Sequence, residues 1–516
     1  MKLKVCLLLI VFIGISINSF AQKEEREANY HYKSENYYVA VNLFEKLYQQ
    51  DTTGENTIFR YADCLVKCQH NPELAVRLFT KLDSSMGNDP NYNFNLGLAY
   101  HYSHRFATAS KYFEKASSLA SKDEVLQKTA NMWKSYAESA ISLTKKPLDV
   151  TFVNMDKYIN SEMNETTPFI SSDGELLFYT SNQRFDNKFM LYSSNVYFSD
   201  SKDGLFLKGK TLAAVNSMDD EFLAGISLYD DKLFVQLQGF DAFQDIISSD
   251  RNGKAYRGKN MLNEHVNSKD GEFAAFETSG GDTLYFSSTR NGGQGGSDLY
   301  YSLKLPDGNW SIPRNLGAPI NTEYDEDFPV ISPDGSQIYF CSNNPNSMGG
   351  FDIFVSKINA LKRDFGTPKN IGYPLNDMFD NKTIAYSDNN RFAYVSAIRP
   401  DGFGHADLYR VVFNQEDPSV KLYLLHLKKG SDQAMEKFAA ADTSLSIRVL
   451  NKNKVTFGEY AYDATNSLAT IALPPGFYTI EIKGQAIEEY SFKVTIPDVP
   501  TSEKMVHKDI LLKLNK

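Results

Sequence analysis

Cysteine and histidine are few in this 516-residue sequence, and basic residues are outnumbered by acidic ones. With four cysteines, hydrophobic cores rather than disulfides must hold the chain together. Cys64 and Cys68 lie four residues apart in a helical stretch. We interpret them as buried apolar residues, the alternatives being a strained disulfide or half of a metal site.

The net charge of -10 disfavours nucleic acid, which binds to basic surfaces. We therefore expect no metal, no cofactor and no nucleic-acid partner.

Catalytic motifs are also missing. The sequence has no Gly-x-Ser-x-Gly elbow, no His-Glu-x-x-His and no phosphate-binding glycine loop, and its eight histidines are scattered. Glycine pairs at Gly292-Gly293 and Gly349-Gly350 resemble nucleotide cradles in isolation, but similar runs recur before an aspartate, which favours turns between strands. We predict no catalytic residues, and an unrecognised enzyme site is the minor alternative.

Long apolar runs are absent except at the N-terminus. Two lysines precede an apolar stretch from Val5 to Ile17, and Ser19-Phe20-Ala21 provides small residues for cleavage. This pattern predicts a secretory signal peptide, residues 1–21, and therefore export. Cys6 lies too early for lipoprotein processing, so we expect no lipid anchor.

Residues 22–146 have helical periodicity. A small–aromatic–apolar triplet recurs at steps of 35 and 34 residues, as Ala40/Phe44/Leu47, Ala75/Phe79/Leu82 and Ala109/Phe113/Ala116. The third copy also has Leu96, Gly97 and Tyr100 in the preceding helix. The segment resembles the tetratricopeptide repeat, which implies a helical solenoid with a groove for a partner. Candidates to line the groove, unless they pack between helices, are Tyr30, Tyr32, Tyr61, Tyr92 and Tyr100.

Residues 151–413 repeat one pattern five times. Its clearest copy is DEDFPVISPDGSQIYFCS from Asp325, followed by GGFDIFVS from Gly349: three strands, an Asp-Gly turn and a glycine-rich turn. Each copy begins with an asparagine, and the steps of 56, 51, 54 and 55 residues separate Asn160, Asn216, Asn267, Asn321 and Asn376. This period predicts a β-propeller of five blades, or six if one copy is degenerate. The repeats resemble the TolB-type, WD40-like propeller family.

The two ends of the repeated region are predicted to meet. The fifth copy lacks an outer strand, whereas Thr151–Ile159 resembles an outer strand with no copy before it. We expect this segment to complete the last blade, which closes the ring and hides its edges. The asparagines are interpreted as structural. The aspartates that open the third strands are also interpreted as structural, because we expect them to cap turns. Calcium ligation is the alternative for these residues, which are Asp245, Asp298, Asp352 and Asp407.

Residues 418–516 are predicted to form another all-β unit. Alternating strands begin at Lys421, Ser444, Ala469, Tyr478 and Tyr490. The segment LPPGFY, from Leu473, resembles the Pro-Gly-Tyr turn of carboxypeptidase-regulatory-like domains, which are small transthyretin-like β-sandwiches.

Acidic residues cluster just before the inner strands of the repeats. In a closed ring these positions converge on one face, where their field would attract a basic segment or a cation. A solvated rim of turn residues is the alternative. We predict a binding face formed by Asp219, Asp220, Glu221, Asp270, Glu323, Asp325 and Asp327.

The order of these segments resembles the PorE-like family of Bacteroidota envelope proteins, associated with type IX secretion and gliding motility. The resemblance implies a non-enzymatic periplasmic scaffold, associated with the outer membrane, that docks to a β-barrel of the PorP/SprF type. The family's usual C-terminal OmpA-like domain is not expected here, because the sequence ends at Lys516 directly after the strand DILLKL. We therefore expect no direct peptidoglycan binding. The alternative is a periplasmic carbohydrate- or peptide-binding module for nutrient uptake.

Overall fold

The computed structural model describes residues 23–515 except 187–190, 203, 228, 230–231, 240–242, 254, 333, 360–363, 388–390, 416–419, 432–433, 438–444, 486 and 500–504. The predicted signal peptide lies outside the described residues. The chain forms two compact units. The first contains the chain up to residue 148 with 342–354 and 369–381, and the second contains the remainder. No helix among the described residues is long and apolar enough to cross a membrane.

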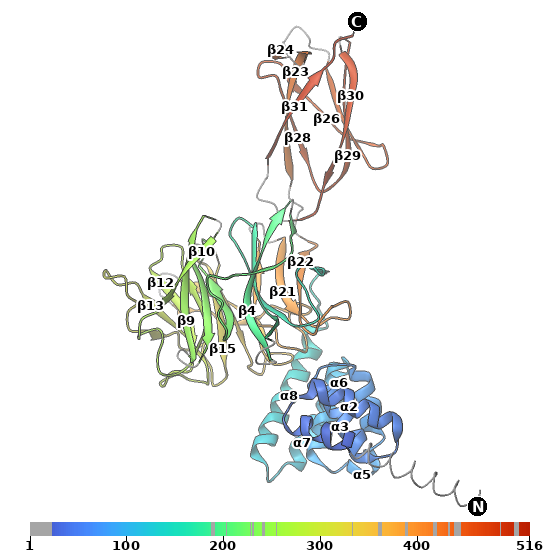
Figure 1. The fold of residues 1–516 in the computed structure, drawn as a ribbon, viewed down its shortest axis with the longest axis vertical. Coiled ribbons are helices and arrows are strands. Elements are labelled where there is room, and N and C mark those ends of the chain that lie inside the picture. Colours follow the sequence, from blue (N-terminus) through green and yellow to red (C-terminus); the bar gives the residue numbers. More distant parts are fainter. Residues whose placement is uncertain are drawn as a thin grey trace, which may run out of the picture. The chain divides into compact units, whose positions relative to one another are not determined.

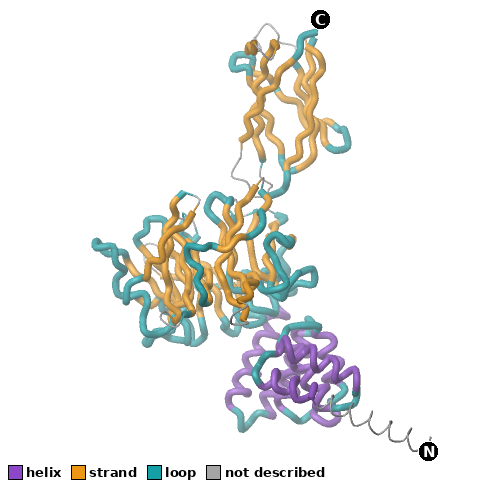
Figure 2. The backbone as a smooth tube through the Cα atoms, in the orientation of Figure 1, coloured by secondary structure: helices purple, strands orange, loops and turns teal. Residues whose placement is uncertain are grey.

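Helices dominate the first unit (Figures 1 and 2). Residues 23–33 are helical, and α2 to α8 follow: Tyr37–Gln50, Glu55–Lys67, Pro72–Thr80, Asp83–Met86, Pro90–Tyr102, Phe106–Leu119 and Glu124–Leu143. Three helices begin at a side-chain cap that accepts a backbone N–H three residues on, formed by Asn71, Asp89 and Asp123. All nine residues of the predicted triplets are buried, because each faces a neighbouring helix.

The cysteines Cys64 and Cys68 of this unit are buried, whereas its tyrosines differ in exposure. Cys64 and Cys68 are buried free thiols, as predicted. Burial raises the pKa of the Cys68 thiol to about 11. Tyr61 and Tyr92 are buried between helices and cannot line a groove, whereas Tyr30 is 67% exposed.

Two distant segments complete the helical core. Met348 and Met378 are buried in the same hydrophobic cluster as the helices. The buried His101 ring places Nε2 2.7 Å from the carbonyl oxygen of Met348, 247 residues away in sequence. Tyr136 and Ser139 donate to the carbonyls of Asn343 and Pro345, at 2.5 and 2.9 Å. Nothing in the sequence pattern predicts this packing.

Five small sheets follow the helices in sequence (Figure 1). The first contains β2 to β6: Glu165–Ile170, Leu176–Asp186, Leu191–Lys202, Leu205–Phe206 and Lys210–Thr211. The second contains β7 to β10: Asp220–Ile226, Lys232–Gln238, Phe243–Asn252 and Ala255–Met261. The third contains β11 to β14: Glu272–Glu277, Thr283–Ser288, Asp298–Leu303 and Arg314–Asn315.

The last two sheets follow the same scheme. The fourth contains β15 to β19: Glu326–Ile331, Gln337–Ser342, Asp352–Asn359, Asp364–Phe365 and Lys369–Asn370. The fifth contains β20 to β22 with β1: Ile384–Tyr386, Phe392–Ala397, Asp407–Phe413 and Val150–Asn154. In the fifth sheet, β1 pairs antiparallel with β22, with Phe152 opposite Val411. The predicted completion of the last repeat by the N-terminal strand is confirmed.

The repeated asparagines join each sheet to the one before it. Each side chain bonds both the N–H and the C=O of one residue on the third strand of the preceding sheet, at 2.8–3.0 Å. Asn160 does so with Leu408, which joins the first sheet to the fifth. The structural interpretation of the asparagines is confirmed. The predicted caps are also confirmed for the aspartates that accept N–H groups of their own turns, Asp298, Asp352 and Asp407.

The C-terminal strands form two further sheets around one core. β23 to β31 span Lys421–Ser431, Ala434–Lys437, Ser446–Asn451, Thr456–Tyr460, Tyr462–Asp463, Leu468–Leu473, Gly476–Gly484, Ile487–Ile496 and Met505–Leu512. One sheet has the order β24-β23-β28-β27, with β31 parallel to β23, and the other has the order β26-β25-β29-β30. Alternating side chains of both sheets are buried, which is the packing that the strand periodicity predicts.

Candidate functional site

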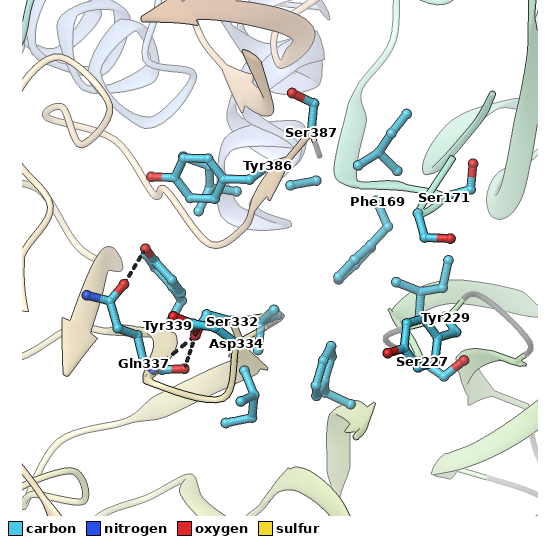
Figure 3. A pocket seen from close by; sticks show the side chains of 18 residues that line it. Phe169, Ser171, Ser227, Tyr229, Ser332, Asp334, Gln337, Tyr339, Tyr386 and Ser387 are labelled. Atoms are coloured by element: carbon cyan, nitrogen blue, oxygen red, sulfur yellow. Dashed lines mark hydrogen bonds between the residues drawn. The ribbon is translucent and has the colours of Figure 1, made fainter. Parts of the chain in front are cut away.

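The first strands of all five sheets line one cavity of about 510 Å³ (Figure 3). Its wall is apolar and takes side chains from every sheet, including Phe169, Ile226, Phe276, Val330 and Ile384. Hydroxyl-bearing residues line it as well, and we call these residues the rim: Ser171, Ser227, Ser332, Ser387, Tyr229, Tyr339 and Tyr386. Figure 3 shows Tyr339 and Tyr386 on one side of the cavity, with Tyr229 across from them and Phe169 between.

Hairpin turns fix the serines at the rim. The Ser332 hydroxyl donates to the Asp334 carboxylate at 2.6 Å and accepts the Gln337 N–H at 2.9 Å. Ser171 makes the same two bonds, with Asp173 and Leu176. The rim serines thus hold the turn between the first two strands of a sheet, as side-chain caps commonly do.

The rim tyrosines pack as a pair. The rings of Tyr339 and Tyr386 lie 5.6 Å apart, and the Tyr339 hydroxyl donates to Gln337 Oε1 at 3.0 Å. Burial raises the pKa of both phenols, so they stay neutral. Among the described lining residues, Asp334 bears the one charged side chain. Hydrogen bonds, first from Ser332 and then from Ser336, lower the pKa of Asp334 to about 2.

These lining residues supply binding groups rather than an acid–base pair. A mostly apolar wall with a few fixed polar groups is typical of a ligand site. The cavity therefore suits an uncharged ligand or an apolar segment that also makes hydrogen bonds at the rim.

The predicted acidic face lies at the other ends of the same strands. The seven predicted residues precede or begin the first strands, whereas the cavity is lined by the strand ends, and none of the seven lines it. Glu221 and Asp327 are buried, and burial raises the pKa of both carboxyls. The Asp327 carboxylate accepts the Ser287 hydroxyl at 2.5 Å and the Phe328 N–H at 2.7 Å.

The other five predicted residues lie nearer the surface. Asp220 and Asp325 accept the N–H groups of Ser194 and Ser297 in the preceding sheets, at 2.6 and 2.9 Å. Asp219 and Glu323 are exposed, and Asp270 is half-buried. Asp219 lies close enough to Glu221 to raise the pKa of the Glu221 carboxyl. In the same way, Asp325 raises the pKa of the Asp327 carboxyl. A binding role for this face stays a prediction.

Buried glutamates recur five residues after the repeated asparagines. Each accepts the hydroxyl of a serine or threonine four residues earlier, and the four are Glu165, Glu221, Glu272 and Glu326. In the fifth sheet Asn381 takes this place and accepts the Asp377 N–H at 2.7 Å. These residues therefore brace the entry to each sheet and are withheld from solvent.

Sequence reasoning missed the cavity. The available signal was the end of four of the five aligned inner strands, where TPFIS, AGIS, PVIS and IAYS place an apolar or aromatic residue before a serine. The spacing alone does not tell whether such residues face a cavity or a neighbouring sheet, because both positions are apolar in a buried strand.

Comparisons with known proteins identify no family. No family model matches the sequence, and no curated protein matches it. One similar structure is a putative TolB from Agrobacterium tumefaciens, 18% identical with a TM-score of 0.30, covering 47% of this chain and 72% of that one. Another is PcrH in complex with the chaperone binding region of PopD, 16% identical with a TM-score of 0.21, covering 24% and 92%. A third is the Trypanosoma rangeli sialidase in complex with the inhibitor DANA, 9% identical with a TM-score of 0.31, covering 71% and 92%. Likenesses this weak carry no argument about function.

Proposed function

We propose that this chain is a non-enzymatic periplasmic scaffold, associated with the outer membrane, that holds partner proteins. Its five sheets would be the blades of a β-propeller, preceded in sequence by a tetratricopeptide-repeat domain and followed by a carboxypeptidase-regulatory-like sandwich. One observation carries the proposal: residues of five sheets line one cavity, and its lining combines apolar side chains with hydroxyl groups.

The cavity would receive an apolar segment of the partner. Val330, Ile384 and Phe276 offer an apolar wall, and the exposed Tyr229 offers a hydroxyl group to the backbone of an entering chain. Burying apolar area contributes roughly 25 cal/mol per Å², so a few inserted side chains are enough for specific docking. Because the chain has several modules, modest contacts at each would add through linkage.

We propose a PorP/SprF-type barrel, or another component of the type IX secretion and gliding machinery, as the partner. The order of segments in the sequence supports this choice. The exposed acidic residues Asp219 and Glu323 would add attraction for a basic segment of the same partner.

A pull-down from detergent-solubilised outer membranes tests the proposal. Tyr229 is 64% exposed at the cavity rim, so Tyr229→Asp places a charge there without disturbing the core. Tyr158→Asp is the matched control, because Tyr158 is 54% exposed and does not line the cavity. We expect the wild-type and control chains to recover such a barrel, and Tyr229→Asp to recover about tenfold less, as a loss of about 1.4 kcal/mol would produce.

Two results would overturn the proposal. Recovery of no envelope barrel by the wild-type chain would reject the scaffold function. Equal recovery by both variants would remove the cavity as the docking site. The variant Glu323→Lys, tested in the same pull-down, measures the contribution of the acidic face. Unchanged recovery of the barrel by this variant would count against a basic segment of the partner that binds this face.

A further inference from the structure

Two histidine side chains meet edge to edge in the C-terminal sandwich. His426 lies on β23 and His507 on β31, which are adjacent parallel strands. Nε2 of His426 is 3.0 Å from Nδ1 of His507, and the ring planes differ by 10°. The strand register places Asp509 directly opposite His426. Three side chains with metal-binding atoms therefore gather on one stretch of the sheet.

This group borders a hollow of about 350 Å³ that solvent can enter. The hollow is also lined by Lys428, Asn466 and Ser467. His507 is exposed and His426 half-buried. The Asp509 carboxylate accepts Lys428 Nζ at 2.8 Å. Within the part of the chain that the structure describes, each ring makes its hydrogen bond to the other ring, so both can turn toward a ligand in the hollow.

We propose that His426 and His507, assisted by Asp509, bind one divalent ion of copper or nickel. A metal lies about 2.0–2.1 Å from an imidazole nitrogen. Two nitrogens 3.0 Å apart then subtend an angle of about 90–97° at the metal. That angle matches the square-planar or tetragonal geometry of Cu²⁺ and Ni²⁺, whereas a tetrahedral Zn²⁺ would need the nitrogens about 3.3–3.4 Å apart.

Metal binding replaces the hydrogen bond between the rings. In that bond one neutral imidazole donates and the other accepts. The donor moves its proton to its other nitrogen through water, and both rings turn so that their lone pairs point at the metal; no net proton is lost. Asp509 leaves Lys428 to become a third ligand, and water fills the remaining positions.

The proposed metal site would have coordination positions for water or another ligand. Among the described residues, no group of three His, Cys, Asp or Glu side chains is already arranged to hold a metal. The two imidazole nitrogens would therefore supply the first two ligands, and the remaining coordination positions would face the hollow. The expected order of affinity is Cu²⁺ above Ni²⁺ above Zn²⁺.

Titration of the tag-free full-length chain with Cu²⁺, in the presence of glycine as a weak competitor, tests the proposal by calorimetry and electron paramagnetic resonance. We expect one ion per chain and a spectrum with two coupled nitrogens. His426→Gln and His507→Gln should each weaken binding at least tenfold. His70→Gln, an exposed histidine elsewhere, should leave it unchanged. Asp509→Asn should weaken binding severalfold while keeping the two-nitrogen spectrum.

The proposal would be overturned by the absence of stoichiometric binding, by binding that survives both histidine variants, or by a spectrum with one nitrogen. Thermal melting without metal shows whether each variant folds. The spectrum of the wild-type chain needs no variant, so it decides the number of nitrogens in any case.

Discussion

Replacing Glu272 by alanine tests whether the buried glutamates hold the sheets in place. The Glu272 side chain is fully buried at the start of β11. Its carboxylate accepts the Ser268 N–H at 3.0 Å, the Ser268 and Ser288 hydroxyls at 2.7 Å each, and Arg290 at 3.1 Å. Removing it leaves a backbone N–H and the largely buried Arg290 guanidinium short of an acceptor.

The magnitude follows from the ion pair. Breaking a buried pair by removing one partner costs about 3–5 kcal/mol. Arg290 keeps its bonds to the carbonyls of His265 and Val266 and its position over Phe286, so we expect the lower end, about 3 kcal/mol. For a region of this size that loss lowers the melting temperature by about 6–12 °C.

Calorimetry of the full-length chain measures the shift, and the amide exchange of Ser268 assigns the transition to the third sheet. Assignment is needed because a multidomain chain melts in more than one step. Glu323→Ala is the matched control, since Glu323 is an exposed acidic residue of the next repeat. It should change stability by less than about 0.5 kcal/mol. Equal shifts for the two variants would refute the structural role of Glu272.

Two further predictions concern the first unit. Burial, opposed by bonds from Asn370 and Met348, raises the pKa of Asp352 well above its ordinary range. An unfolded aspartate loses its proton near pH ~4, so the stability of the wild type should fall as pH rises from there through the raised pKa of the folded protein. The stability of Asp352→Asn relative to wild type should increase over the same range, whereas parallel melting curves would contradict this. Gly97→Ala places a Cβ 2.7 Å from the buried Phe113 ring. The overpacking of about 1–3 kcal/mol should lower the melting temperature despite the better helix propensity of alanine, and an unchanged or higher value would show that α6 and α7 can separate.

The sequence predicted the parts of the fold in which a local pattern has one structural solution. The buried triplets follow from helical spacing, and the C-terminal strands follow from alternation. The closing strand β1 followed from counting strands in the repeats. The packing of Met348 and Met378 into the helical core was out of reach, because a methionine in a loop carries no sign of the surface that will cover it.

The acidic face also shows how far residue spacing can predict the structure. Spacing correctly located acidic residues at the starts of the first strands, but it could not separate exposed from buried ones. Glu323 and Glu326 are three residues apart in one repeat, yet one is exposed and the other fully buried beneath Thr322. The offset from the repeated asparagine distinguishes these two, since a buried glutamate follows it by five in four of the repeats.

Glycines in the loops before the third strands show which role recurring residues have in this chain. The runs were interpreted as turns, but a Cβ on Gly295, Gly349 or Gly404 would lie 1.8–2.1 Å from the backbone of the next repeat. Gly404 meets Met163, so the same contact joins the last repeat to the first. The asparagines likewise touch the preceding sheet. These recurring asparagines and glycines therefore hold neighbouring sheets together. Selectivity for a ligand must come instead from cavity positions at which the repeats differ, such as Tyr229 and Gln337.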